Sequence, residues 1–182
     1  MEHVRYDNVA RTLHWVMAAL IILMMVAGTN LENLTAEDRT RPLMVHSGIG
    51  LILLILVTIR LWWRLRHPAP PYPSTMSALQ QKFAKGIVHS FYALMIFQPI
   101  VGLLHAGTYV DTTVSPFGLF NLTTLIPSDV EVTKFFHVLH VWGFSLLATL
   151  LIIHVGATLK HWLINRDQIP SRMVPFVKPP KK

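Results

Sequence analysis

The sequence predicts an all-α protein whose four helices cross a membrane as a bundle. Hydrophobic residues make up 52% of the 182-residue chain and charged residues only 14%, which does not describe a soluble globular domain. Several long segments lack Asp, Glu, Lys and Arg, and a helix needs roughly 20 apolar residues to cross the hydrocarbon core. We expect one domain with spans at about 12–31, 42–64, 86–108 and 136–162, followed by a flexible basic tail at about 166–182.

The first span could instead be read as a secretory signal peptide, because basic residues precede it and Ala27-Gly28 resembles a cleavage site. Its uncharged stretch, 12–31, is longer than the roughly 7 to 15 residues of a signal-peptide core. His14-Trp15 at its entrance is also unusual for a discarded leader. We therefore expect this helix to be retained.

The segments between the spans have distinct compositions. The second span ends in Arg60 to Arg64, an aromatic and basic anchor typical of a membrane interface. Residues 67–73 form a proline-rich connector that cannot be helical. Pro99 is expected to kink the third span. The loop from Asp111 to Lys134 is long enough to cover a site at the surface.

Charge and cysteine content exclude several classes of protein. The net charge is +7, but the basic residues flank the apolar spans, which argues against nucleic acid as a partner. The N-terminal segment, the end of the second span with the connector after it, and the end of the fourth span with the tail hold 13 of the 16 Lys and Arg residues, so the positive-inside rule predicts cytoplasmic termini. The absence of Cys excludes disulfides, iron–sulfur ligation and c-type haem attachment.

The fourth span carries the most informative side chains. Residues 135–159 contain no charged residue but include His137, His140 and His154, and ionisable groups inside a membrane are costly and usually functional. His140 and His154 are 14 positions apart, which leaves them about 40° apart around a helix and about 21 Å apart along it. One helix therefore presents two nearly aligned imidazoles, one near each membrane face. His137 is turned about 100° away from His154.

Depth along the spans divides the histidines into two layers. The cytoplasmic layer contains His14, His89, His154 and His161, and the outer layer contains His46, His105, His137 and His140. A haem iron takes axial ligands from opposite sides of its ring. We therefore expect His14 with His154 to bind an inner haem, and His46 with His140 to bind an outer one.

Three alternative interpretations remain open. A buried membrane histidine can simply hydrogen-bond a neighbouring helix, a contact worth about 0.6 kcal/mol. His137 and His140 share a helix face as zinc ligands can, although Asp129 or Glu131 would have to complete the site. A chain of histidines could also relay protons in a transporter, but no Asp or Glu lies inside a span to cooperate.

Further residues are candidates for contacts near the two membrane faces. On the cytoplasmic side, candidates for contact with haem propionates or a quinone are Arg60, Arg64, His89 and His161. On the outer side, candidates for attracting an anion are Arg39, Arg41, Lys134, His105 and His137. Interfacial anchoring is the simpler role for most of these residues.

The order and spacing of these motifs resemble the prokaryotic cytochrome b561 family over nearly the whole chain. The matching motifs are Leu13-His14-Trp15, His46-x-x-Gly, Arg60 through Arg64 before the proline-rich connector, His89, and His140 with His154 before Leu159-Lys160-His161. The resemblance implies a four-helix protein of the bacterial inner membrane with two haems b per chain. It also implies that His14, His46, His140 and His154 are the iron ligands.

Some members of that family are similar to a superoxide:ubiquinone oxidoreductase. The resemblance therefore implies transmembrane electron transfer from an outer, periplasmic donor, either superoxide or a redox protein, to membrane ubiquinone. As an alternative, related proteins serve as cytochrome b membrane-anchor subunits that pass electrons for a dehydrogenase or hydrogenase. This chain has Val141 where some members have an acidic residue after the outer ligand of the fourth helix.

Overall fold

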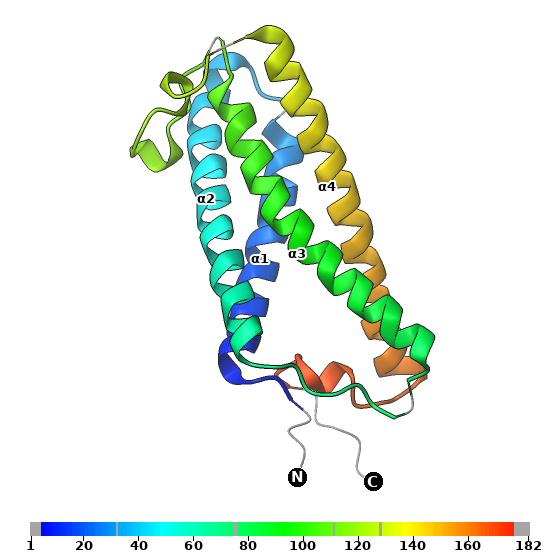
Figure 1. The fold of residues 1–182 in the computed structure, drawn as a ribbon. Helices are drawn as coiled ribbons and strands as arrows, with labels where there is room; N and C mark the ends of the chain where they lie inside the picture. Colours follow the sequence, from blue (N-terminus) through cyan, green and yellow to red (C-terminus); the bar gives the residue numbers. More distant parts are fainter. Residues whose placement is uncertain (1–4, 32, 75, 111, 128, 177–182) are drawn as a thin grey trace.

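The computed structural model describes residues 5–176 except 32, 75, 111 and 128. Four long helices run up and down the molecule, and short helices lie in the connections (Figure 1). The long helices are α1 (Asn8–Leu31), α2 (Ala36–Arg66), α3 (Ala78–Gly107) and α4 (Val130–Leu159), and the short ones are η1 (Pro116–Gly118), η2 (Leu122–Thr124), η3 (Lys160–Ile164) and η4 (Pro170–Arg172). The described residues contain no strand, which confirms the all-α prediction.

Polar residues set the starts of the long helices. The side chains of four capping residues accept hydrogen bonds from backbone N–H groups of the first turn, namely Asp7, Thr35, Ser77 and Asp129. Such caps satisfy backbone donors that have no partner within the helix. Because the caps lie in the polar connections, the helices extend past the uncharged stretches into the interfacial region.

All four long helices are long and apolar enough to cross a membrane. Their outer faces carry large apolar side chains that are half-exposed or more, among them Ile22, Leu23, Val26, Ile55 and Ile152. Water would not favour so large an apolar surface, whereas lipid acyl chains cover it without cost. The chain is therefore a membrane protein.

The helices pack as an open row. α1 packs on α2, α2 on α3 and α3 on α4, whereas α1 and α4 approach each other far less closely within the described residues. Two small clusters of buried residues support the row, one around Met17 and Val57 and the other around Leu43 and Val114. This arrangement leaves space between the two helix pairs, and that space holds the site described below.

The two ends of the bundle differ in their connections. We call the end at which α1 begins the proximal end and the opposite end the distal end (Figure 1). At the proximal end the N–H of Tyr6 donates to the Arg172 carbonyl at 3.3 Å, and the Trp15 indole donates to the Met173 carbonyl at 3.0 Å. Ser171 and Arg172 are buried there. Flexibility of the tail stays a prediction, and its last residues, 177–182, lie outside the described residues.

Candidate functional site

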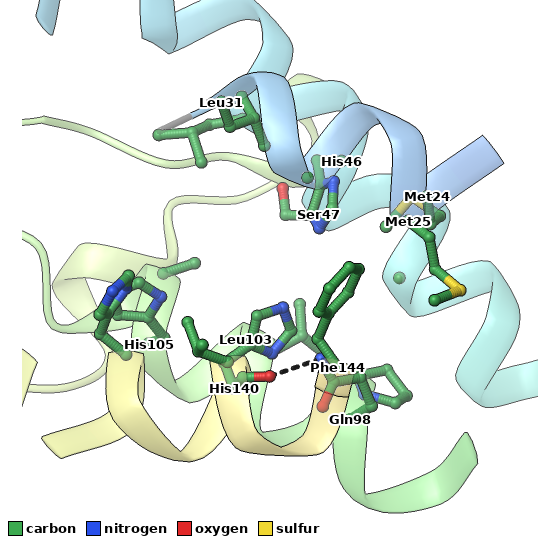
Figure 2. A pocket seen from close by; sticks show the side chains of 18 of the residues that line it. Met24, Met25, Leu31, His46, Ser47, Gln98, Leu103, His105, His140 and Phe144 are labelled. Carbon is green, nitrogen blue, oxygen red and sulfur yellow. Dashed lines mark hydrogen bonds between the residues drawn. The ribbon is translucent and has the colours of Figure 1, made fainter. Parts of the chain in front are cut away.

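Two histidines face each other across a cavity in the distal half of the bundle. His46 on α2 and His140 on α4 lie with ring centroids 6.4 Å apart and ring planes at 74° (Figure 2). The cavity has a volume of about 660 Å³ and is lined by residues of all four long helices. This volume falls within the range of about 300 to 1,000 Å³ typical of ligand and cofactor sites.

The separation of the two rings suits a metal ion held between them. Two metal–nitrogen bonds of about 2 Å, together with the distance of about 1.1 Å from each nitrogen to its ring centre, span about 6 Å. The buried Nδ1 atoms of His46 and His140 have no hydrogen-bond partner among the described residues. The ring separation therefore leaves room for one metal ion between the two imidazoles.

A second histidine pair lies in the proximal half. His14 on α1 and His154 on α4 have ring centroids 6.1 Å apart and ring planes at 69°. Arg60 on α2 places Nη2 3.2 Å from His14 Nδ1 and donates from Nε to the Tyr92 hydroxyl at 3.3 Å. The positive charge of the Arg60 guanidinium therefore lies beside the His14 ring. The rings of Phe91 and His154 pack edge to face, with their centroids 5.5 Å apart.

Helix α4 contributes to both pairs. His140 and His154 are separated by almost four helical turns, which orients both rings toward the space between the helix pairs. The structure thus brings together the same two pairs that depth along the spans predicts. Their partners, His14 and His46, come from two different helices.

Close approach of α3 to α4 supports the distal pair. Gln98 on α3 donates from Nε2 to the His140 carbonyl at 2.9 Å. A Cβ atom at Gly102 would lie 2.7 Å from Cε1 of His140, and a Cβ atom at Gly143 would lie 2.1 Å from Oε1 of Gln98. An alanine at Gly102 would therefore displace the His140 ring, and one at Gly143 would displace the Gln98 amide. None of these three residues was predicted from the sequence, although the amide of Gln98 within the uncharged stretch 86–110 was a signal that could have identified it.

Three other predicted contact residues lie at the proximal surface. His89 is exposed, and its Nδ1 atom hydrogen-bonds the Lys85 carbonyl at 2.8 Å. His161 pairs with Asp167. The Arg64 guanidinium lies 5.5 Å from the centre of the Tyr6 ring. Of the four basic candidates predicted on this side, Arg60 is the one hydrogen-bonded to a paired histidine.

Basic residues line the cavity toward the distal surface. They are Arg39, Lys134, His105 and His137. The ring of His105 lies 5.3 Å from that of His137 and 6.4 Å from that of His140, so imidazoles continue from the exposed His137 to the buried pair. Arg41, the fifth predicted attractor, is exposed and does not line the cavity.

The alternative of a zinc site at His137 and His140 lacks further ligands. Within the part of the chain that the structure describes, no group of three or more His, Cys, Asp or Glu side chains is arranged to hold a metal ion. A structural zinc site needs about four protein ligands. The geometry favours a metal held by two imidazoles within a larger cofactor.

The chain is similar in sequence to several known proteins over most of its length. Cytochrome b561 homolog 2 of Escherichia coli (strain K12) is 27% identical over 173 residues, covering 93% of this chain and 91% of the relative. The probable superoxide oxidase CybB of Yersinia pestis is 23% identical over 176 residues, covering 95% and 97%. Cytochrome b562 of Cereibacter sphaeroides is 22% identical over 177 residues, covering 93% and 94%.

The profile of one protein family, described as prokaryotic cytochrome b561, matches residues 5–176. This match includes every long helix and both histidine pairs. The apolar spans and the cavity between paired imidazoles agree with it. The chain therefore belongs to the prokaryotic cytochrome b561 family, whose members are membrane electron-transfer proteins that carry haem b.

Proposed function

We propose that this chain transfers electrons across the bacterial inner membrane by means of two haems b, one bound by His14 and His154 and the other by His46 and His140. The observation that carries the proposal is the geometry of the two pairs. In each pair, imidazoles from different helices lie 6.1 or 6.4 Å apart, a separation that accommodates one iron between two nitrogens. Family membership supports haem b as the cofactor.

The side chains would determine how such a cofactor works. Haem supplies one-electron chemistry when it is bound. His14 with His154, and His46 with His140, would each hold a haem between two imidazoles, so the chemistry supplied there would be electron transfer rather than binding of a substrate to the metal. Apolar residues such as Leu103 and Phe144 line the distal cavity and exclude water from it. Helix α4 keeps its two histidines about 21 Å apart along its axis.

For the electron donor we propose superoxide at the distal face, and for the acceptor we propose membrane ubiquinone. The cationic residues Arg39 and Lys134 at the distal end of the cavity would attract a small anion. One relative of similar length is a probable superoxide oxidase. The basic proximal end would lie in the cytoplasm by the positive-inside rule, which places the distal face in the periplasm.

The cofactor is tested by a reduced-minus-oxidised absorption spectrum of the purified protein with haem quantitation. We expect b-type bands and two haems per chain. A colourless preparation from haem-replete cells would reject the proposal, and one haem per chain would reject one of the two sites.

The donor is tested separately by rapid mixing with superoxide in the presence of ubiquinone. We expect haem reduction followed by quinone reduction at a rate that falls with ionic strength, because attraction of an anion is screened by salt. Haem that stays oxidised with superoxide but is reduced by a partner dehydrogenase would instead identify the chain as a membrane-anchor subunit.

A further inference from the structure

The connection between α3 and α4 folds back along the bundle. Figure 1 shows it on the outer side of α2, away from α4. The short helix η1 of this connection packs against α2. Two other side chains of the connection, Val114 and Leu122, are buried together with Leu43 and Ala106. The connection is thus a folded part of the molecule, attached to the face of α2 that the other long helices leave free.

The tip of this connection reaches membrane depth. The Phe117 ring lies against Gly48, where an added Cβ atom would meet ring carbons at 2.5 to 2.6 Å. Gly48 lies six residues inside the uncharged stretch that begins at Pro42, or about 9 Å along the helix axis. It is two residues from His46, so Phe117 lies near the level of the distal histidine pair.

The backbone of the tip adopts an uncommon conformation at this contact. Phe117 has φ 49° and the following Gly118 has φ 75°, so two successive residues adopt left-handed conformations. The first of these is uncommon for a side chain as large as phenylalanine and costs on the order of 1 kcal/mol. Packing of the ring on Gly48 offsets this cost. Gly118 in turn lies beside the end of the Met44 side chain.

The large exposed side chains of the tip are apolar. Leu119 is 73% exposed, Leu125 67%, and Phe117 and Phe120 about 45% and 44%. Residues 112–128 contain no Asp, Glu, Lys, Arg or His. Solvent-exposed loops are usually polar, so this composition is that of a segment in contact with lipid.

Several backbone polar groups of the tip find partners within the loop. Gly118 N–H donates to the Ser115 carbonyl at 2.9 Å, and Leu119 N–H to the Pro116 carbonyl at 3.0 Å. Leu122 N–H donates to the Val114 carbonyl at 2.9 Å. In hydrocarbon each unsatisfied backbone group costs several kcal/mol, so these hydrogen bonds lower the cost of bringing the tip into the membrane.

We propose that residues 115–125 insert into the membrane beside α2 and bind the lipid acyl chains of the distal leaflet. Three observations carry this inference: the depth of Phe117 on α2, the uncharged exposed surface, and the internal hydrogen bonds of the tip. The inserted segment would exclude lipid headgroups and water from the α2 side of the distal cavity. The inference rests on the membrane-spanning fold and not on the identity of the electron donor.

The natural absence of Cys makes a direct test straightforward. Leu119→Cys is labelled with a nitroxide in the full-length haem-loaded protein, reconstituted in phospholipid vesicles. Collision rates with oxygen, which concentrates in hydrocarbon, and with a water-soluble nickel chelate report the surroundings of the label. Ile55→Cys on the outer face of α2 is the lipid reference, and Glu131→Cys at the start of α4 is the aqueous reference.

We expect the oxygen-to-nickel ratio at Leu119 to match that at Ile55 and to exceed that at Glu131 several-fold. A ratio equal to that at Glu131 would overturn the inference. Low accessibility to both reagents would also overturn it, because the label would then lie against a second copy or another protein. Phe120→Cys repeats the measurement at a neighbouring site, and an unchanged haem spectrum confirms that each variant is folded.

Discussion

Each half of the bundle contains a pair of histidines, and the two pairs have different surroundings. The distal pair, His46 and His140, borders a large apolar cavity, and the Nδ1 atoms of both rings lack a hydrogen-bond partner in the described structure. The proximal pair, His14 and His154, does not line that cavity, and Arg60 hydrogen-bonds His14. Ring separations differ by only 0.3 Å, from 6.1 to 6.4 Å.

The histidines that would hold a cofactor are therefore distinct from the neighbouring residues that would adjust its electrostatics and packing. Two imidazoles on facing helices suffice to define each site, so the ring separations are nearly equal. The nearby groups then set electrostatics and packing, with a cation at the proximal site and the close contacts at Gly102 and Gly143 at the distal site. We therefore expect changes to the histidines to affect haem content, and changes to their neighbours to affect potential or stability.

Removing one histidine from each pair should have the largest effect. His140→Ala and His154→Ala should each reduce haem content from two per chain to one, because each removes one of the two imidazoles that would hold a haem. Haem quantitation with a reduced-minus-oxidised spectrum measures this loss. His67→Ala is the matched control, since His67 stacks on Trp63 outside both pairs. Two haems in both variants would reject the assignment.

Glycine substitutions should affect the distal half selectively. Gly143→Ala places a Cβ atom 2.1 Å from Gln98 Oε1 and should destabilise the protein by about 1–3 kcal/mol, with partial loss of haem at the distal site. Gly156→Ala is the control, because its Cβ would meet nothing within 4 Å among the described residues. It should be neutral or stabilising by up to about 1 kcal/mol. Thermal unfolding in nanodiscs measures both, and equal effects would contradict the expected difference.

Loss of the Arg60 cation should change the midpoint potential of the haem in the proximal half. Arg60→Gln removes a positive charge beside His14, and a positive charge favours the reduced form of a bound haem. One midpoint potential should therefore fall, by an amount on the order of 50 mV, while haem content stays at two per chain. Arg64→Gln, which changes a residue lying over Tyr6, should produce a smaller shift. Redox titration that finds both potentials unchanged in Arg60→Gln would refute this role.

The smallest effect is expected at the proximal surface. Burial alone would raise the pKa of Asp7, but hydrogen bonds from the Ala10 N–H and the Trp63 indole outweigh it and hold the pKa below its usual value. A lowered pKa means that ionised Asp7 stabilises the fold above about pH 4 and that this contribution is lost as the pH falls through the lowered value.

Asp7→Asn tests this contribution. Because Asp7 is exposed, the variant should lose less than about 1 kcal/mol at pH 7. Its difference from the original protein should shrink below about pH 4, as measured by thermal unfolding at both pH values. A difference that grows on acidification would contradict the sign, and haem content at the distal site should not change.

Local pattern was sufficient to predict the helices and the alignment of two histidines. Uncharged stretches of about the length of a bilayer span predict spanning helices, and the described residues contain four such helices. The 14-residue spacing of His140 and His154 predicts a shared face because helix geometry is regular within one element. The non-helical connector at 67–73 followed from proline chemistry and is confirmed.

Only the tertiary structure decided which distant side chains meet. Arg60 and His14 are 46 positions apart, and Gln98 and His140 are 42 apart, so no helical period relates them. The same holds for Phe117, whose position on Gly48 depends on how the α3–α4 connection folds back against α2. A sequence read one segment at a time predicts faces and depths, because these follow from repeating backbone geometry. Contacts between segments depend on how the helices pack, and packing is a property of the whole chain.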